Sequence, residues 1–456
     1  MKTDLLADRH IGIQEADLPA MLEKIGVKSL DELINKTIPS KIRLKEPLAL
    51  AAPMTEREFA EHIAGLASLN KIYTSYIGMG WYDTITPAVI QRNVFENPAW
   101  YTSYTPYQTE VSQGRLEALL NFQTVISDLT AMPLANCSLL DEATAAAEAA
   151  TMMYGLRSRD QQKKGTNVLF VDESIFPQNL AVIQTRVIPQ GMKIQVGNYK
   201  ELEFTPEIFA CIIQYPNASG SVEDYREFVE KAHAANCKVA VDADILSLAL
   251  LLPPGEWGAD IVFGSTQRLG IPLFYGGPSA AYFATRDEYK RNMPGRIIGL
   301  SKDKYGKICY RMALQTREQH IKREKATSNI CTAQALLATM AGFYAVYHGQ
   351  EGIKNIAKRI HSIATWLNKA LARLGYVQHN EIFFDTLRFS LPDHVSAQKL
   401  RTIALSKEVN LCYYDNGDVG FSIDETTDLK DVNLLLSIFS IAAEETMRSS
   451  SRRKTI

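Results

Sequence analysis

Short apolar runs alternate with helical segments through the middle of the chain. The apolar runs cover residues 168–172, 194–196, 209–215, 239–243 and 261–263. Runs of this length without polar alternation are typical of strands buried on both faces of a sheet. Helical segments lie between several of them, and the segment from Ser221 to Ala235 carries acidic residues in its first turn, which favour a helix start. The pattern predicts a mostly parallel, doubly wound α/β domain.

The two ends of the chain have other patterns. Apolar spacing predicts two helices before residue 35 and a third from Thr55, and both Ser29-Leu-Asp-Glu32 and Thr55 with Glu58 have capping-box spacing. After residue 332, helical stretches separated by strand-like segments predict a small α+β domain. We therefore expect four parts: an N-terminal helical arm and linker (1–60), a large α/β domain (61–331), a small C-terminal domain (332–448) and a disordered tail (449–456).

Composition narrows the class of protein. The 456 residues carry a formal net charge of −2, so we expect no nucleic-acid partner. No window reaches the roughly 18 apolar residues of a membrane span, and the N-terminus is too polar for a secretory signal. The six cysteines are scattered without a Cys-x-x-Cys pair, which argues against a metal site or a disulfide framework. We expect a cytoplasmic protein that binds neither a membrane nor a metal.

Nucleotide-binding loops are not found in the sequence. It contains no Gly-x-x-x-x-Gly-Lys-Ser/Thr, and Gly78-Met-Gly80 continues with Trp81 and Tyr82 instead of completing a Gly-x-Gly-x-x-Gly motif after a strand. An ordinary ATPase or NAD enzyme is therefore disfavoured.

A strand followed by a small-residue turn and a Gly-rich loop occupies residues 260–278. In enzymes that hold pyridoxal phosphate (PLP) as a Schiff base, such a turn normally presents a lysine. Here the turn offers Gln267 and Arg268. A carboxamide forms no Schiff base, and an arginine stays protonated at physiological pH. The segment predicts a PLP-type architecture without its covalent anchor.

Two pairs of carboxylates lie where a PLP fold would contact its cofactor. Asp141 and Glu142 open an Ala-rich helix whose amides would receive the phosphate, and there they would repel a phosphate dianion. Asp242 and Asp244 end a strand, the position of the Asp that pairs with the pyridine nitrogen. The simpler interpretations, acidic residues at a helix start and a strand-end carboxylate that caps the next helix, are favoured for both pairs.

Two further segments are rich in polar groups. Residues 97–117 combine aromatic, hydroxyl and amide side chains with Arg115, and are interpreted either as a loop packed on a domain face or as one wall of a polar pocket. Residues 311–331 are strongly basic. Most of that run is interpreted as a solvated helix face, whereas Lys325-Ala-Thr-Ser-Asn329 is a candidate anion or backbone clamp at a helix start.

Long motifs in these segments resemble one family. They are His-Ile-Gly at 10–12, Ser-Tyr-Ile-Gly-Met-Gly-Trp-Tyr at 75–82, Tyr-Thr-Pro-Tyr-Gln-Thr-Glu-Val-Ser-Gln-Gly-Arg-Leu-Glu at 104–117, Ser-Leu-Leu-Asp-Glu-Ala-Thr-Ala-Ala-Ala-Glu at 138–148, Leu-Gln-Thr-Arg-Glu-Gln-His at 314–320 and Lys-Ala-Thr-Ser-Asn-Ile-Cys at 325–331. They resemble the glycine dehydrogenase (decarboxylating) family, the P-protein of the glycine cleavage system, from about residue 8 to 440. The match is to the N-terminal half of the fused form, so the chain resembles subunit 1, the alpha subunit, of the two-subunit form.

The resemblance implies a fold-type-I PLP-dependent transferase fold and a divided active site. The PLP lysine of the family lies in the other half, and Gln267 takes its place here. Phe176 stands where that other half has a histidine stacked on the cofactor. PLP is therefore expected on a lysine-bearing partner, subunit 2, in an assembly of the α2β2 type, with none covalently bound to this chain. The implied reaction decarboxylates glycine and passes its aminomethyl group to the lipoyl arm of the H-protein.

The expected site residues form two groups, with no catalytic residue in this chain alone and no metal ligand. The degenerate pocket comprises Asp141, Glu142, Phe176, Asp242, Asp244 and Gln267. The residues expected at the partner's active site or interface are Thr105, Tyr107, Gln108, Ser112, Gln113, Arg115, Arg317, His320, Lys325, Thr327, Ser328 and Asn329. The alternatives are a stand-alone PLP lyase or transferase that uses another lysine such as Lys325, and a non-catalytic scaffold subunit.

Overall fold

The computed structural model describes residues 12–102, 106–327, 330 and 333–453. It divides into two compact units, Met1–Tyr73 and Thr74–Ile456. The described part of the first unit holds helices α2 (Leu18–Ile25), α3 (Leu30–Thr37) and α4 (Glu56–Ala67). The capping box at Thr55 and Glu58 is confirmed. At α3, Ser29 accepts from the Glu32 N–H, whereas the Glu32 carboxylate accepts from the Lys28 N–H, so that cap is only half of a box.

A seven-stranded sheet forms the centre of the second unit. Its order is β2-β8-β7-β6-β5-β3-β4. Strands β3 to β7 pair in parallel, and β8 runs antiparallel to its neighbours β2 and β7. The five strands expected from the apolar runs are confirmed. The bounds are β2 Leu134–Ala135, β3 Val168–Asp172, β4 Lys193–Gly197, β5 Ile208–Tyr215, β6 Lys238–Ala243, β7 Ile261–Ser265 and β8 Ala281–Thr285.

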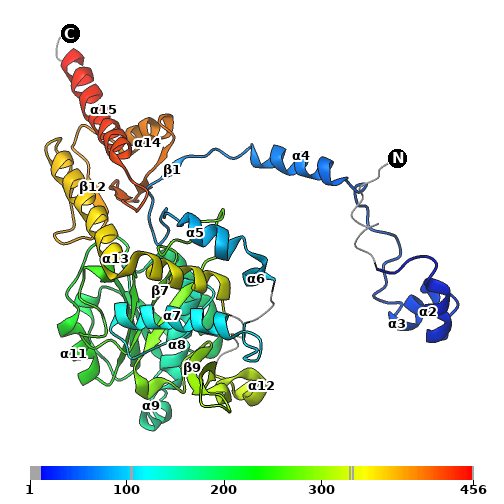
Figure 1. Ribbon diagram of the computed structural model, residues 1–456. Helices are drawn as coiled ribbons and strands as arrows, with labels where there is room; N and C mark the ends of the chain where they lie inside the picture. Colours follow the sequence, from blue (N-terminus) through cyan, green and yellow to red (C-terminus); the bar gives the residue numbers. More distant parts are fainter. Residues whose placement is uncertain (1–11, 103–105, 328–329, 331–332, 454–456) are drawn as a thin grey trace. The chain divides into compact units, whose positions relative to one another are not determined.

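Helices cover both faces of this sheet, as a doubly wound fold requires (Figure 1). Along β6, Val239 and Val241 pack into one core with α7 (Gln113–Thr130), α11 (Arg226–Ala234) and the first part of α13 (Ala335–Ala372). Ala240 points to the other core, which contains α8 (Glu142–Gly155) and α10 (Pro177–Val187). The alternation follows from the two-residue period of a strand. Strands buried on both faces therefore read as continuous apolar runs.

Helix α11 begins later than its acidic first turn suggested. The Asn217 carboxamide accepts the backbone N–H groups of Ser219 and Ser221, and Ser221 forms a bridge with Phe383. The Asn217 N–H also donates to the Ser221 carbonyl at 3.0 Å, and this uses the acceptor that a helix from Ser221 would need. The helix therefore starts at Arg226.

A second, four-stranded antiparallel sheet has the order β11-β12-β15-β14. Its strands are β11 Val377–Gln378, β12 Thr386–Ser390, β14 Cys412–Tyr413 and β15 Val419–Ser422, and α14 (Ala397–Ser406) and α15 (Leu429–Arg453) accompany it. The rings of Phe389, Phe421 and Phe439 pack together in its core. Helix α13 reaches this core after a break at Gly349, whose φ of 63° interrupts the helix between the two segments expected from the sequence. α15 stays helical through residues 449–453, where we expected a disordered tail, and residues 454–456 lie outside the described part.

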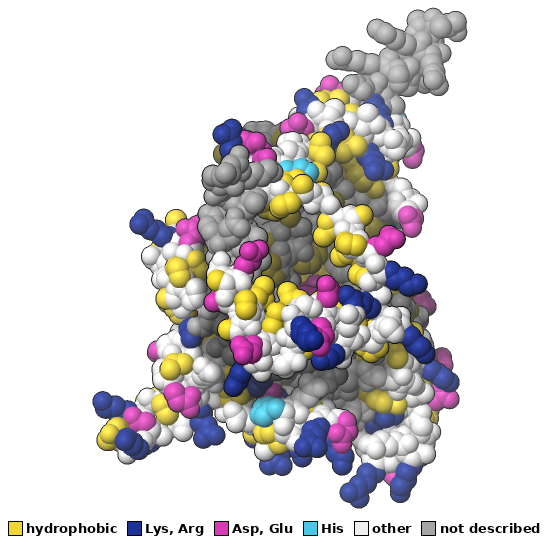
Figure 2. Space-filling model, turned by 90° about the vertical axis from the view of Figure 1, so that its right-hand side faces the viewer, with side chains coloured by type: hydrophobic (Ala, Val, Ile, Leu, Met, Phe, Trp, Pro, Cys, Tyr) yellow, Lys and Arg dark blue, Asp and Glu magenta, His cyan; other side chains and the backbone are white. Residues whose placement is uncertain are grey.

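The remaining elements are short. β9 (Ile297–Lys302) and β10 (Ile308–Ala313) form an antiparallel hairpin, and β1 (Thr74–Ser75) pairs in parallel with β13 (Val409–Asn410). Short helices are α5 Ala88–Ile90, the π-helical turn η1 Gln91–Phe95, α6 Pro98–Tyr101, α9 Arg159–Lys163 and α12 Gln319–Lys322. Acidic and basic side chains are interspersed on the face in Figure 2. In the described part of the chain, no helix combines the length and apolarity needed to cross a membrane.

Candidate functional site

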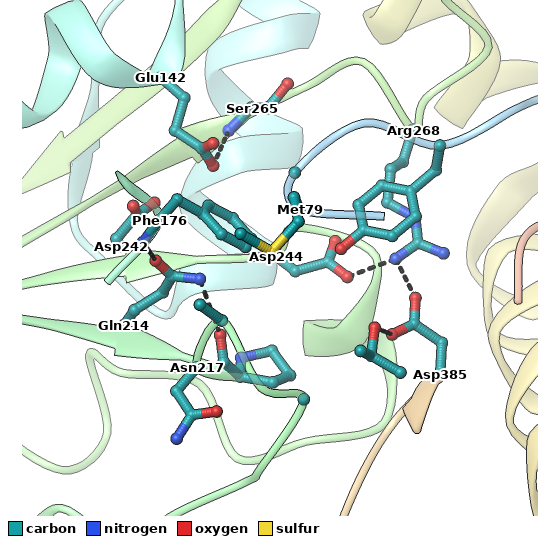
Figure 3. Close-up of a pocket in the computed structure, with 16 residues that line it drawn as sticks. Met79, Glu142, Phe176, Gln214, Asn217, Asp242, Asp244, Ser265, Arg268 and Asp385 are labelled. Carbon is teal, nitrogen blue, oxygen red and sulfur yellow. Dashed lines mark hydrogen bonds and ion pairs between the residues drawn. The ribbon is translucent and has the colours of Figure 1, made fainter. Parts of the chain in front are cut away.

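A small pocket lies at the carboxyl ends of the parallel strands, where α/β sheets place their ligands (Figure 3). Strand ends β5, β6 and β7, the start of α8 and the segment before α10 all contribute to its wall. Its free volume is about 30 Å³, room for two or three water molecules at roughly 10–15 Å³ each. It is lined by Met79, Gly80, Tyr82, Glu142, Phe176, Gln214, Pro216, Asn217, Ala218, Gly220, Asp242, Asp244, Ser265, Arg268, Asp385 and Thr386.

Gln267 lies buried beside this pocket and is fully used in hydrogen bonds. Its side-chain amide donates to the backbone carbonyl groups of Tyr82 at 2.6 Å and of Ile271 at 2.8 Å. Its carbonyl oxygen accepts the Tyr82 N–H at 3.2 Å. Gln267 therefore pins the backbone of the 75–82 motif against the turn after β7. The side chain that the resemblance places at the position of the PLP lysine therefore has a structural role in this chain.

We expect Gln267→Leu to destabilise the protein by about 1–3 kcal/mol, because it leaves the backbone groups of Tyr82 buried without partners. Equilibrium urea denaturation measures this change. Gln195→Leu on β4 is the matched control, because the Gln195 side chain is exposed and should shift stability by no more than about 0.5 kcal/mol. Equal effects of the two variants would contradict the role of Gln267.

Arg268 forms a buried ion-pair bridge next to Gln267. Its Nη1 lies 2.6 Å from Asp244 and 2.5 Å from Asp385 (Figure 3). Its guanidinium stacks on Tyr82, 3.9 Å from the ring centre. Asp244 follows β6 of the large sheet, and Asp385 precedes β12 of the small sheet, so Arg268 joins the two sheets. Asp244 also caps the turn that follows, since it accepts the Leu246 N–H at 3.0 Å.

Half-buried Glu142 and buried Asp242 form a pair of carboxyl groups that share a hydrogen bond. Burial raises the pKa of Glu142 to about 7, and burial together with the charge of Glu142 raises the pKa of Asp242 well above its usual value. Two adjacent carboxyl groups cannot both ionise cheaply, so the pair holds a proton near neutral pH. Asn179 donates to Asp242 at 2.7 Å, and Ser265 N–H donates to Glu142 at 3.2 Å. Asp141 lies apart from the pocket and caps α8 by accepting from the Thr144 N–H at 2.7 Å.

Side chains from the 75–82 motif and from Phe176 close the pocket. Gly80 has φ +91°, and a Cβ there would lie 3.0 Å from a Glu142 carboxylate oxygen and 3.1 Å from the Phe176 ring. Gly80 therefore permits a close approach that no other residue allows. The Phe176 N–H donates to Gln214 at 2.7 Å, and Gln178 donates to the Met79 carbonyl at 2.8 Å.

These residues do not fit PLP. Gln267 provides no amine, and Arg268 is held by two carboxylates. Asp141 and Glu142 occupy the helix start that would receive a phosphate, and the Glu142 carboxyl pairs with Asp242, the residue placed to meet the pyridine nitrogen. A free volume of about 30 Å³ is far too small for the cofactor. In the described residues, no group of three or more His, Cys, Asp or Glu is arranged to hold a metal ion.

The polar residues that precede α7 are partly packed into the protein. The Tyr107 hydroxyl accepts the Ala333 N–H at 3.2 Å, and burial raises the pKa of Tyr107. Ser112 is buried, and its hydroxyl accepts a hydrogen bond from half-buried Arg115 at 3.0 Å. Thr105 lies outside the described residues.

Gln113 anchors the β9–β10 hairpin to α7. Its side chain donates to the Tyr310 carbonyl at 2.9 Å and accepts the Tyr310 N–H at 2.8 Å. Gln108 is exposed. Among the described candidate residues of this segment, Gln108 and Arg115 are therefore available for contacts outside the chain, whereas Gln113 has a structural role.

The basic segment after β10 is not a single cluster. Arg317 is buried and donates to the backbone carbonyl groups of residues 293, 295 and 314. His320 and Lys325 are exposed, and the half-buried Thr327 hydroxyl donates to the Arg291 carbonyl at 3.5 Å. The expected helix start beside Lys325 was wrong, because α13 begins at Ala335. Ser328 and Asn329 lie outside the described residues.

Several pocket residues did not emerge as candidates from the sequence. Tyr82 was noted only within a motif, and Asp385 only within an expected strand. Gln214, the residue before the last of β5, had no sequence signal. Gly78 and Gly80 in the sequence are typical of a turn or a close backbone contact, and both residues have a positive φ in the structure.

Comparison with known proteins agrees with this architecture. A family model for the glycine cleavage system P-protein matches residues 8–439. Glycine dehydrogenase (decarboxylating) of Bacteroides thetaiotaomicron is 80% identical over 443 residues, which cover 97% of this chain and 47% of that protein. The protein of the same name from Flavobacterium johnsoniae is 56% identical, with 97% of this chain and 46% of the relative covered. The chain thus spans about half the length of the curated relatives it matches.

Solved structures show the same fold. A crystal structure of glycine decarboxylase (P-protein) of the glycine cleavage system, in inhibitor-bound form, has a TM-score of 0.84 and 30% identity, covering 95% of this chain and 99% of that chain. A sphingosine-1-phosphate lyase from Burkholderia pseudomallei has a TM-score of 0.65 at 11% identity, covering 90% and 95%, and shows the fold alone. The expected fold-type-I PLP-dependent transferase fold is confirmed. Since the family model matches well over half of its residues, the chain belongs to the glycine cleavage system P-protein family.

Proposed function

We propose that this chain is the half of a glycine decarboxylase that lacks the PLP lysine, with Gln267 in its place, and that it works with a partner half that carries this lysine and holds PLP. When bound there, PLP serves as the electron sink for the loss of CO2 from glycine. The aminomethyl group then passes to the lipoyl arm of the H-protein. The setting is the cytoplasm, and the assembly is of the α2β2 type.

The observation that carries this proposal is the state of the Gln267 turn. Gln267 bonds three backbone groups, and Arg268 bridges two carboxylates. Both side chains are therefore committed to the chain's own structure. The half-length coverage of the relatives supports a second half that supplies the chemistry.

The contribution of this chain is a polar surface toward the partner's site. Arg115 is the best-positioned candidate, because Ser112 orients its guanidinium while the side chain stays half-buried. A fixed guanidinium is suited to a carboxylate or phosphate oxygen. The surface also includes exposed Gln108 and Lys325. Thr105 and Asn329 are assigned to it from the sequence alone.

A first test separates this proposal from a stand-alone PLP enzyme. The purified chain is incubated with PLP and reduced with borohydride, and the label on each lysine is measured by mass spectrometry. We expect no stoichiometric label on this chain, and a stoichiometric label on the partner half in the reconstituted complex. A stoichiometric label on Lys325 or another lysine here would refute the proposal.

A second test separates an active-site contribution from a scaffold. In the reconstituted complex, we expect Arg115→Met to lower kcat for CO2 release from carboxyl-labelled glycine by about 10-fold or more, equivalent to at least about 1.4 kcal/mol. Assembly, measured by analytical ultracentrifugation, should be unchanged. Arg373→Met, at an exposed arginine that follows α13, is the control and should retain full turnover. Loss of assembly alone would favour the scaffold.

A further inference from the structure

A second pocket lies at the opposite edge of the large sheet. Its wall comes from the end of α8, the amino ends of β5, β6 and β7, and the segment after β8. Its volume is about 340 Å³, within the roughly 300–1,000 Å³ of small-molecule sites. The polar lining residues that matter here are Arg157, His233, Lys238, Asp260, Arg286 and Tyr289. The pocket with Gln267 lies at the carboxyl edge, so the two are separate.

Two half-buried cations in this pocket are held in fixed positions. The Arg157 guanidinium lies 3.3 Å from the centre of the Tyr154 ring and donates to the carbonyl groups of Tyr154 and Thr166. The Lys238 ammonium lies 2.9 Å from the Tyr289 hydroxyl and 4.7 Å from the centre of its ring. Within the part of the chain that the structure describes, neither cation has a carboxylate within 4 Å.

The one carboxylate that lines the pocket is already saturated. Asp260 is buried and accepts from the Val239 N–H at 2.8 Å, from His233 at 2.9 Å and from the Tyr289 hydroxyl at 3.2 Å, and Arg286 lies 3.7 Å away. Asp260 therefore fixes these groups at the pocket wall and leaves little capacity to neutralise Arg157 and Lys238. Exposed Glu288, which contacts the Tyr289 hydroxyl, is the other acidic group nearby.

Three permanent cations thus face one carboxylate in a pocket of small-molecule size. Of the three, only Arg286 has a carboxylate, Asp260, within 4 Å in the described part of the chain. Fixed donors such as Arg157 and Lys238 favour an anion with several oxygens, because each oxygen can meet a different donor without rearrangement. We propose that this amino-edge pocket binds a phosphate-bearing small molecule between Arg157, Lys238 and Arg286. Nothing in this proposal depends on the chemistry of the partner half, so it stands or falls separately from the proposed function.

The test is isothermal titration calorimetry of the full chain with inorganic pyrophosphate at constant ionic strength. We expect saturable binding at one site per chain, and an approximately 10-fold or greater loss of affinity in Lys238→Met, which keeps the aliphatic stem but removes the charge. Lys238→Arg should retain binding. The matched control is Lys164→Met, which removes the same charge from an exposed residue that does not line the pocket. It should leave affinity within about 2-fold, because an exposed charge outside the site is screened by salt.

Each other outcome would overturn the proposal. No saturable heat with the wild-type chain excludes a phosphate site. Equal losses in Lys238→Met and Lys164→Met indicate general attraction to a basic surface. Binding of citrate but not of pyrophosphate assigns the pocket to carboxylates. A circular-dichroism melt of Lys238→Met checks folding. If that variant unfolds, Lys238→Gln and Arg286→Gln, which also remove one pocket charge each, provide the same comparison.

Discussion

Replacing Arg268 by methionine should produce the largest loss of stability in this chain. The substitution leaves Asp244 and Asp385 facing each other without their shared cation, and Asp385 is buried. Removing one partner of a buried ion pair typically costs about 3–5 kcal/mol. With a urea m-value of about 3 kcal/mol per M, the denaturation midpoint should fall by roughly 1–2 M.

Two companion variants test this explanation. Arg268→Met combined with Asp385→Asn removes one of the stranded charges and should recover part of the lost stability, because the cost arises from unpaired buried carboxylates. Arg226→Met breaks an exposed pair with Asp224 and should leave the midpoint essentially unchanged. If the double variant is as unstable as Arg268→Met, lost packing against Tyr82 explains the effect better than charge.

Glu142→Gln should change how stability depends on pH. The pKa of Glu142 is raised from 4.5 in the unfolded chain to about 7 in the folded protein, chiefly by burial. The folded state therefore binds more protons than the unfolded state between these values, so the wild-type protein loses stability as pH rises from about 4.5 to about 7. We expect the variant to lose about 1–3 kcal/mol less than the wild type between pH 5 and pH 8.

The measurement is the free energy of unfolding from urea curves at several pH values. A glutamine at position 142 can still donate to Asp242, so the pocket should stay folded. Glu230→Gln, at an exposed site on α11, should keep the wild-type slope. Parallel curves for the wild type and Glu142→Gln would show that the carboxyl pair does not hold the extra proton.

The strands of the large sheet were predictable because each is buried on both faces. A strand buried on both faces has a continuous run of apolar residues in the sequence. The strands β3, β5 and β6 therefore start and end within one residue of the expected runs. Boundaries that depend on local side-chain caps were less predictable. At Ser221, hydrogen bonds exchanged with Asn217 and a bridge to Phe383 override the acidic first-turn pattern.

The site was predictable only where its residues are marked by chain position. The apolar pattern locates the ends of strands and the starts of helices. Three site residues lie at such positions: Glu142 at the start of α8, Asp242 near the end of β6 and Gln267 just after β7. Their partners come from far along the chain, as with Tyr82, which is 185 residues from Gln267. Arg317 was expected at the partner's active site, but its guanidinium donates to backbone carbonyl groups of this chain. The periodicity of the sequence does not reveal such contacts. Pairings between distant segments are a property of the tertiary structure.

The Arg268 bridge bears on motion as well as stability. It fastens the end of β6 in one sheet to the start of β12 in the other through two short contacts. Enzymes that close over a ligand need hinges between their domains. In this chain, the ion pairs of Arg268 with Asp244 and Asp385 hold the two sheets together instead. We therefore expect the two sheets of this chain to keep their relative orientation, with no opening or closing between them.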